Sequence, residues 1–250
     1  KTMKSLSTLA IALLLSAFSA QAITVDEILK NYFDNTGGLA LWQKIETMKM
    51  SGNVPTPQGD FSFVVMSKSP NKTRIEVDIQ GTQMIPQCYN GETAWTLNPF
   101  AGGKTAAKMT DEETKELAEE AIFESEYIDY KKKGHEITLE GKEVIDGVDC
   151  YKLKVHKNVG NDMEESVEYH FFDTENFVPI MIRTTIKVGP GKGGTAEEYL
   201  SDYQETEYGI IMPYYFETKM EGQVVNQIVV EKVDINVDIE DSIFEMPAAE

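Results

Sequence analysis

Apolar residues follow a helical period just after residue 22, and beyond about residue 60 they change to a period of two. Thr24 and Glu27 have the spacing of a capping box, which marks a helix N-terminus. Gly37 and Gly38 predict the end of this helix, because glycine is favoured just past a helix C-terminus. A short second helix is expected from residue 39 to about residue 45. The apolar face of the first helix is made by Val25, Ile28, Leu29, Tyr32 and Phe33.

The period of two predicts β-strands joined by tight turns. In the strand after Asn71, apolar residues alternate with Arg74, Glu76 and Asp78, so one face is apolar and the other charged. Asn90-Gly91 is a pair typical of a two-residue hairpin turn. A register slip of one residue would reverse the two faces. We expect the inward side chains of these early strands to form the wall of an interior: Phe61, Phe63, Val65, Ile75, Val77, Ile79, Trp95 and Leu97.

Residues 99–134 interrupt the strands. Thr110 and Glu113 form a second capping box, and residues 111–126 are helical by propensity, with eight acids and one lysine. Leu117, Ala121 and Ile122 fall on one face of this helix. Two interpretations fit the pattern. The segment is either a solvated amphipathic helix or a movable cover over the apolar face of the sheet.

Strands then resume to the end of the chain, with turn pairs such as Asp146-Gly147 and Glu221-Gly222 between them. The runs between turns give about ten or eleven strands, and a sheet of that size must curl, close or split. No linker divides the chain after residue 22, so residues 23–250 are expected to form a single domain. The predicted fold class is α+β, mainly antiparallel β, in which the N-terminal and mid-chain helices lie over a curled sheet.

Residues 1–22 have the three parts of a secretory signal peptide. Lys1 and Lys4 form a basic start, an apolar run covers residues 9–18, and Ala20-Gln21-Ala22 fits a cleavage site. A retained membrane anchor is the alternative, but the run is about half the roughly 20 residues that a spanning helix needs. We therefore expect cleavage after Ala22 and a soluble, exported protein. No cysteine lies near that site to accept a lipid.

The formal net charge of −19 argues against two classes of binding partner. Nucleic acid and anionic lipid headgroups would be repelled, so neither is expected to bind. Cys88 and Cys150 could pair in an oxidising compartment. We favour two separate buried thiols, because free cysteine behaves as a small core hydrophobe.

No pattern in the sequence supports catalysis. Residues 189–194 match G-x-G-x-x-G, but a strand-rich segment follows where a dinucleotide site requires a helix, which favours a hairpin loop. His135, His156 and His170 are scattered and lack zinc-ligand spacing. We therefore expect neither an enzyme nor a metal or other cofactor.

What remains is a surplus of large apolar residues. Eleven Met, eleven Phe, eleven Tyr and two Trp serve one sheet that few helices cover. Most must pack the core, but a curled sheet also encloses an interior, and an interior that side chains do not fill holds a ligand. Methionine suits a flexible acyl tail because it repacks easily.

Three stretches, together with the opening helix and Trp42, carry a family resemblance. They are SPNKTRIE (69–76), YNGETAWTLNP (89–99) and DSIFEMP (241–247). They resemble the outer-membrane lipoprotein-sorting proteins of the LolA-like superfamily. That resemblance implies a half-open antiparallel barrel with helical lids over an apolar cavity. It also implies a monomeric periplasmic carrier of acylated lipoproteins or lipids, which exchanges cargo with an inner-membrane release protein and an outer-membrane acceptor.

The resemblance also assigns roles to residues. Arg74 lies in the stretch that matches the strand arginine which latches the lid in the soluble carriers. We expect the apolar residues of the two helices to cover the mouth when it is empty: Ile28, Leu29, Tyr32, Phe33, Leu117, Ala121 and Ile122. A lipid- or protein-binding sensor of the cell envelope, built on the same fold, is the alternative function.

Overall fold

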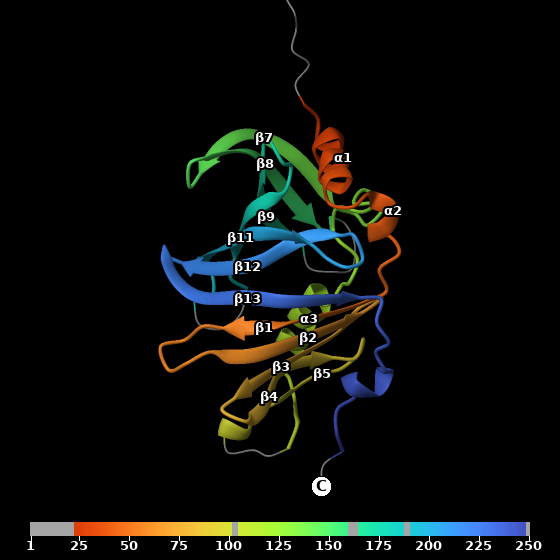
Figure 1. The fold of residues 1–250 in the computed structure, drawn as a ribbon, viewed down its shortest axis with the longest axis vertical. Helices are drawn as coiled ribbons and strands as arrows, with labels where there is room; N and C mark the ends of the chain where they lie inside the picture. Colours follow the sequence, from red (N-terminus) through yellow and green to blue (C-terminus); the bar gives the residue numbers. More distant parts are fainter. Residues whose placement is uncertain (1–22, 102–104, 160–164, 188–190, 249–250) are drawn as a thin grey trace, which may run out of the picture.

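The chain folds around one antiparallel sheet, seen in a computed structural model that describes residues 23–101, 105–159, 165–187 and 191–248. The sheet has thirteen strands in the order β6-β5-β4-β3-β2-β1-β13-β12-β11-β10-β9-β8-β7 (Figure 1). The strands are β1 (Thr47–Val54), β2 (Phe61–Lys68), β3 (Lys72–Ile79), β4 (Thr82–Tyr89), β5 (Ala94–Leu97), β6 (Ala107–Lys108), β7 (Glu136–Ile145), β8 (Val148–Lys157), β9 (Ser166–Asp173), β10 (Pro179–Thr185), β11 (Thr195–Glu205), β12 (Ile211–Met220) and β13 (Gln223–Ile235).

The chain enters the sheet at its middle and leaves it there. The first six strands run outward from β1 to the edge strand β6, and the next seven return from the opposite edge, β7, to pair β13 with β1. The sheet is curled and unclosed, which confirms the predicted mainly antiparallel fold class and the half-open barrel. Two strands were not predicted from the sequence. β6 has only two residues, and β1 contains polar and glycine residues that hide its alternation.

Gly52 in β1 shows why that alternation is broken. The pairing of β1 with β13 shifts register between Ser51 and Gly52. A Cβ atom on Gly52 would lie 2.0 Å from the Val229 carbonyl oxygen, so only glycine allows the two backbones to approach this closely.

The helices begin where the capping boxes predict. α1 (Val25–Asn35) starts after Thr24 and α3 (Asp111–Glu120) after Thr110, with both reciprocal hydrogen bonds of each box present. α2 (Leu39–Trp42) is shorter than expected. α3 ends six residues before the predicted end at residue 126. The N–H of Phe123 donates to the Pro70 carbonyl at 3.0 Å, so a tertiary contact replaces the next helical turn. Two 3-10 segments are η1 (Pro99–Ala101) and η2 (Asp241–Phe244).

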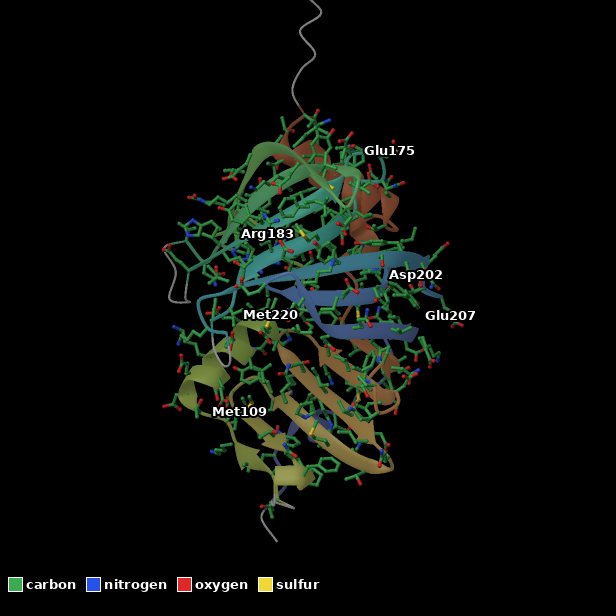
Figure 2. The ribbon with its side chains drawn as sticks, turned by 90° about the vertical axis from the view of Figure 1, so that its left-hand side faces the viewer. Met109, Glu175, Arg183, Asp202, Glu207 and Met220 are labelled. Carbon is green, nitrogen blue, oxygen red and sulfur yellow. The ribbon has the colours of Figure 1, made fainter. Side chains whose placement is uncertain are left out.

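Cross-strand pairing defines two faces of the sheet, because directly opposed residues point to the same side. We call the face that carries α1 and α3 the inner face. The helix α3 contacts β4 and β5, and α1 contacts β7. In Figure 1 α1 and α2 lie beside the upper strands, and in Figure 2 α3 lies at one side of the lower strands near Met109. The segment η2 contacts β3 on the outer face.

Other expectations concern single residues and segments. Cys88 and Cys150 are both free and buried, as predicted. The loop that contains the G-x-G-x-x-G match joins the antiparallel neighbours β10 and β11, although residues 188–190 lie outside the described residues. The predicted signal peptide at residues 1–22 also lies outside them. None of the helices described in the structure is long and apolar enough to cross a membrane.

Candidate functional site

An apolar strip crosses the inner face at the middle strands. Five of its side chains are buried and the others are only partly buried, although they lie in the centre of the sheet. The inner strip consists of Phe63, Met212, Tyr214, Val230, Val233, Met48, Met50, Val54, Val65, Val77, Phe216, Ile228 and Ile235. Its two methionines on β1 are flexible side chains that repack around different apolar surfaces.

The structure divides the eight residues predicted to form one wall. Phe63, Val65 and Val77 belong to the inner strip, and pairing places the other three residues of β2 and β3 on the same face. Trp95 and Leu97 do not join them, and this part of the prediction is wrong. Six of the eight predicted residues do lie together on the inner face: Phe61, Phe63, Val65, Ile75, Val77 and Ile79.

Trp95 points to the outer face because of its register. It pairs with Cys88, which pairs with Arg74, and Arg74 precedes the inward Ile75 by one residue. The Trp95 indole N–H donates to the Phe244 carbonyl of η2 at 2.9 Å, and the ring is fully buried. Leu97 packs in the same outer cluster. An alternating sequence shows which residues share a face of a strand, but it does not show whether that face lies on the inner or the outer side of the sheet.

The predicted lid residues cover the two ends of the inner face. Ile28, Leu29, Tyr32 and Phe33 of α1 are buried against β8 and β9, in a cluster that includes Leu153. At the other end of the sheet, two residues of the α3 region pack on Tyr89 and Ala94 of β4 and β5. These are the buried Leu117 and Ala121. Ile122 is 42% exposed, so it is the least covered of the predicted lid residues. The inner strip lies on the strands between the two covered ends.

Arg74 holds the C-terminal segment of the fold, which is a different element from the lid that the resemblance implies. Its guanidinium donates to the Ile243 carbonyl at 2.6 Å and to Glu76 at 2.7 Å, and it lies over the Trp95 ring. These contacts fix the C-terminal segment on the outer face. No described contact joins Arg74 to α1 or α3, because both helices lie across the sheet from it.

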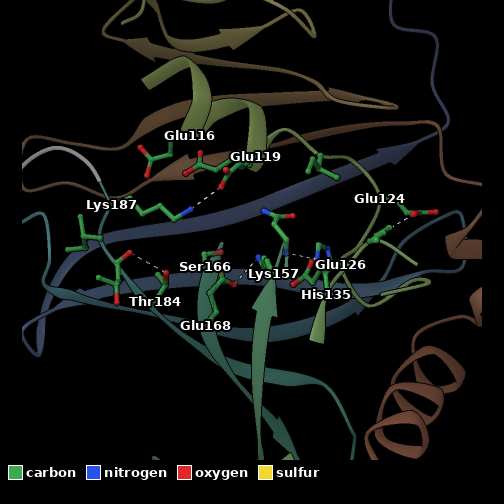
Figure 3. Close-up of a pocket in the computed structure, with 16 residues that line it drawn as sticks. Glu116, Glu119, Glu124, Glu126, His135, Lys157, Ser166, Glu168, Thr184 and Lys187 are labelled. Carbon is green, nitrogen blue, oxygen red and sulfur yellow. Dashed lines mark hydrogen bonds and ion pairs between the residues drawn. The ribbon is translucent and has the colours of Figure 1, made fainter. Parts of the chain in front are cut away.

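A cavity of about 560 Å³ opens on the inner face, between α3 and the ends of β8, β9 and β10 (Figure 3). It differs from the apolar cavity that the sequence predicts, because nine of its sixteen lining residues are charged. Ile122 and Ile186 are the apolar residues in a lining that otherwise consists of Glu116, Glu119, Glu120, Glu124, Glu126, Lys133, His135, Lys157, Asn158, Ser166, Glu168, Thr184, Thr185 and Lys187.

Each lysine of the cavity is paired with a glutamate. The ammonium of Lys187 lies 2.9 Å from Glu119, and that of Lys157 lies 2.9 Å from Glu168. Lys133 lies 2.7 Å from Glu124. Figure 3 shows Lys187 extending from the end of β10 to α3, so this ion pair joins the helix to the second half of the sheet.

A buried polar chain connects the cavity to the α1 cluster. His170 is fully buried, with Nε2 at 2.9 Å from Glu168 and Nδ1 at 2.6 Å from the Tyr127 hydroxyl. The Tyr127 ring contacts the Tyr32 ring of α1 edge to face at 5.5 Å. Burial opposes ionisation of Glu168, but the hydrogen bond to His170 and the charge of Lys157 outweigh it and lower its pKa to about 2. An isolated histidine within a strand gives no sequence signal of this arrangement.

The described residues contain no group of three or more His, Cys, Asp or Glu side chains arranged to hold a metal ion. The acids of the cavity are spread around its wall and are partly neutralised by lysines.

Comparisons with known proteins identify the fold. No family model and no curated protein sequence matches the chain. Among solved structures it is similar to a LolA superfamily protein from Nitrosomonas europaea, with 15% identity and a TM-score of 0.55 over 90% of this chain and 98% of that one. A DUF1329 family protein from Desulfovibrio piger is 14% identical, with a TM-score of 0.55 over 89% of this chain and 97% of that one.

A third similar structure is an outer membrane lipoprotein-sorting protein domain from Vibrio parahaemolyticus. It is 11% identical, with a TM-score of 0.53 over 87% of this chain and 94% of that one. The curled sheet with helices on its inner face is therefore a LolA-like fold, and the likeness extends over nearly the whole described chain.

Proposed function

We propose that this protein is a periplasmic carrier that binds the acyl chains of lipoproteins or lipids and moves them toward the outer membrane. The observation that supports the proposal best is the inner strip. Its side chains are apolar, all but five of them are only partly buried, and they lie between two helices that cover the ends of the same face. A concave apolar surface of this kind shields a hydrocarbon chain from water.

The two helices would act as lids. Burial of each methylene contributes about 0.8 kcal/mol, so a long acyl chain would be held too tightly to be released without an opposing cost. Displacement of a helix that covers the empty site supplies such a cost. In this proposal loading displaces α1 and α3 from the positions that they hold over the inner face in the empty protein, and the ion pair between Lys187 and Glu119 opposes the displacement of α3.

The proposal has consequences beyond the site. The chain would be cleaved after Ala22, remain unanchored and monomeric, and exchange cargo with an inner-membrane protein that loads it and an outer-membrane protein that accepts it. It performs no catalytic step. Sequencing of the mature protein is expected to find Ile23 at its N-terminus.

Native mass spectrometry of protein purified from the periplasm tests acyl binding. We expect a bound species whose mass matches an acyl lipid, and loss of that species in the variant Val65→Thr/Val77→Thr, which makes the inner strip polar with little change in volume. Val144→Thr is the matched control, because Val144 is 61% exposed on the edge strand β7.

Two results would contradict the carrier. A folded protein that carries no lipid and binds no fluorescent fatty acid would exclude acyl binding. A protein that binds lipid but never transfers it between donor and acceptor vesicles would fit the sensor instead.

A further inference from the structure

The charges that line the cavity are not balanced. Six glutamates face three lysines and one histidine, and each lysine is already paired with its own glutamate. Glu116 and Glu120 form no hydrogen bond or ion pair with any described residue. They are four residues apart on α3, so both carboxylates lie on the same face of the helix.

The position of the cavity at the end of α3 adds to this negative potential. The carbonyl groups of the last helical turn carry a partial negative charge, which basic residues normally offset. The last turn of α3 contains no basic residue and ends at Glu120. Desolvation, followed by the charge of Glu116, raises the pKa of Glu120, and the charge of Lys187 offsets this shift only in part.

The cavity and the inner strip lie on one continuous face. Thr184, which lines the cavity, is two residues from Ile182, and Ile182 pairs with Glu198 of β11. Glu198 pairs with Thr218 of β12, which is two residues, or about 7 Å, from Phe216 of the inner strip. The inner face thus continues from the charged cavity to the apolar surface through Ile182, Glu198 and Thr218.

We propose that the cavity binds the ammonium head of an amphiphile whose hydrocarbon tail lies along the inner strip. The inference rests on the proposed acyl-binding function and adds the chemical class of the head group. An anionic head is disfavoured because the cavity has three more acids than lysines. A cation fits because it pairs with Glu116 and Glu120 and offsets the negative end of α3.

The test compares two single-chain amphiphiles of equal length below their micellar concentrations. Dodecylamine and dodecanoate are titrated against a bound neutral fluorescent probe at pH 7 and at physiological salt. We expect dodecylamine to displace the probe from the native protein at about tenfold lower concentration than dodecanoate. That preference is expected to fall to about twofold or less in Glu116→Gln/Glu120→Gln.

The control is Glu175→Gln/Glu207→Gln. It removes the same two charges from turns that Figure 2 labels on the side of the molecule opposite α3. The control corrects for general attraction of amines to an acidic protein and is expected to keep the tenfold preference. Ethanolamine, which has the head without the tail, is expected to leave the probe in place.

Each contrary outcome identifies what is wrong. Equal displacement by dodecylamine and dodecanoate would overturn the ammonium head and leave acyl binding intact. Displacement by ethanolamine would overturn the connection between cavity and strip. Failure of both amphiphiles to displace the probe, in a folded protein, would overturn the acyl-binding function itself.

Discussion

The substitution Arg74→Leu separates two roles for this arginine. In the structure Arg74 holds the C-terminal segment on the outer face, through the Ile243 carbonyl and the Trp95 ring. The family resemblance instead implies that it latches a lid on the inner face. We expect the substitution to release residues 236–248 from the sheet and to leave α1 and α3 in place.

The contacts set the size of the effect. A hydrogen bond from a charged donor contributes about 1.5–3 kcal/mol, and a cation over an aromatic ring adds about 0.5–1 kcal/mol. The ion pair with Glu76 does not enter this sum, because Arg74 and Glu76 lie on the same strand and their contact does not hold the C-terminal segment. Leucine recovers part of the loss by apolar burial. The net cost to the docking of the C-terminal segment is therefore about 2–3 kcal/mol.

Arg183→Leu is the matched control. Arg183 also pairs with a neighbouring glutamate, Glu197, at 2.8 Å and lies over an aromatic ring, Phe171, at 5.0 Å. It has no described hydrogen bond to a backbone carbonyl of another segment, so its loss is expected to cost about 1 kcal/mol or less.

Hydrogen exchange by mass spectrometry, with an acyl-probe titration, is the assay. Arg74→Leu is expected to speed exchange in peptides covering residues 236–248 by about 30- to 100-fold, and to leave probe affinity unchanged. Faster exchange in α1 or α3 with a protected C-terminal segment, together with altered affinity, would refute this reasoning and restore the lid latch.

Three further predictions follow from burial. Leu117 is buried, so Leu117→Ala is expected to weaken the packing of α3 by about 2–5 kcal/mol and to speed proteolysis of the helix. Ile122 is exposed, so Ile122→Ala is expected to change the rate of proteolysis little. Burial raises the pKa of the Cys88 thiol to about 12 and that of Cys150 to about 11, so maleimide at pH 8 is expected to label both only after unfolding. Because the folded-state pKa of Glu168 is about 2, its ionisation contributes up to about 3 kcal/mol above pH 4.5, which is lost as the pH falls toward 2. Urea unfolding at several pH values is expected to show this loss in the native protein and a smaller one in Glu168→Gln.

The sequence by itself determined the local structure. Both capping boxes, at Thr24 and Thr110, start helices as predicted, because each depends only on side chains three residues apart. The alternation in β2 and β3 places Phe61, Phe63, Val65, Ile75, Val77 and Ile79 on one face, because neighbouring side chains in a strand point to opposite sides. The mainly antiparallel fold class follows from these same short-range patterns.

Only the tertiary structure decided which face of the sheet each strand presents and what covers it. Trp95 and Arg74 lie on the outer face because of a pairing register that involves residues on different strands, which an alternating pattern does not contain. The charged cavity likewise joins residues from α3 and three strands that are far apart in the sequence. His170 lies two residues from Glu168 on one face of β9, but it meets Tyr127 only because the fold brings β9 against the segment that follows α3. Such contacts depend on long-range packing, and no local spacing of residues predicts them.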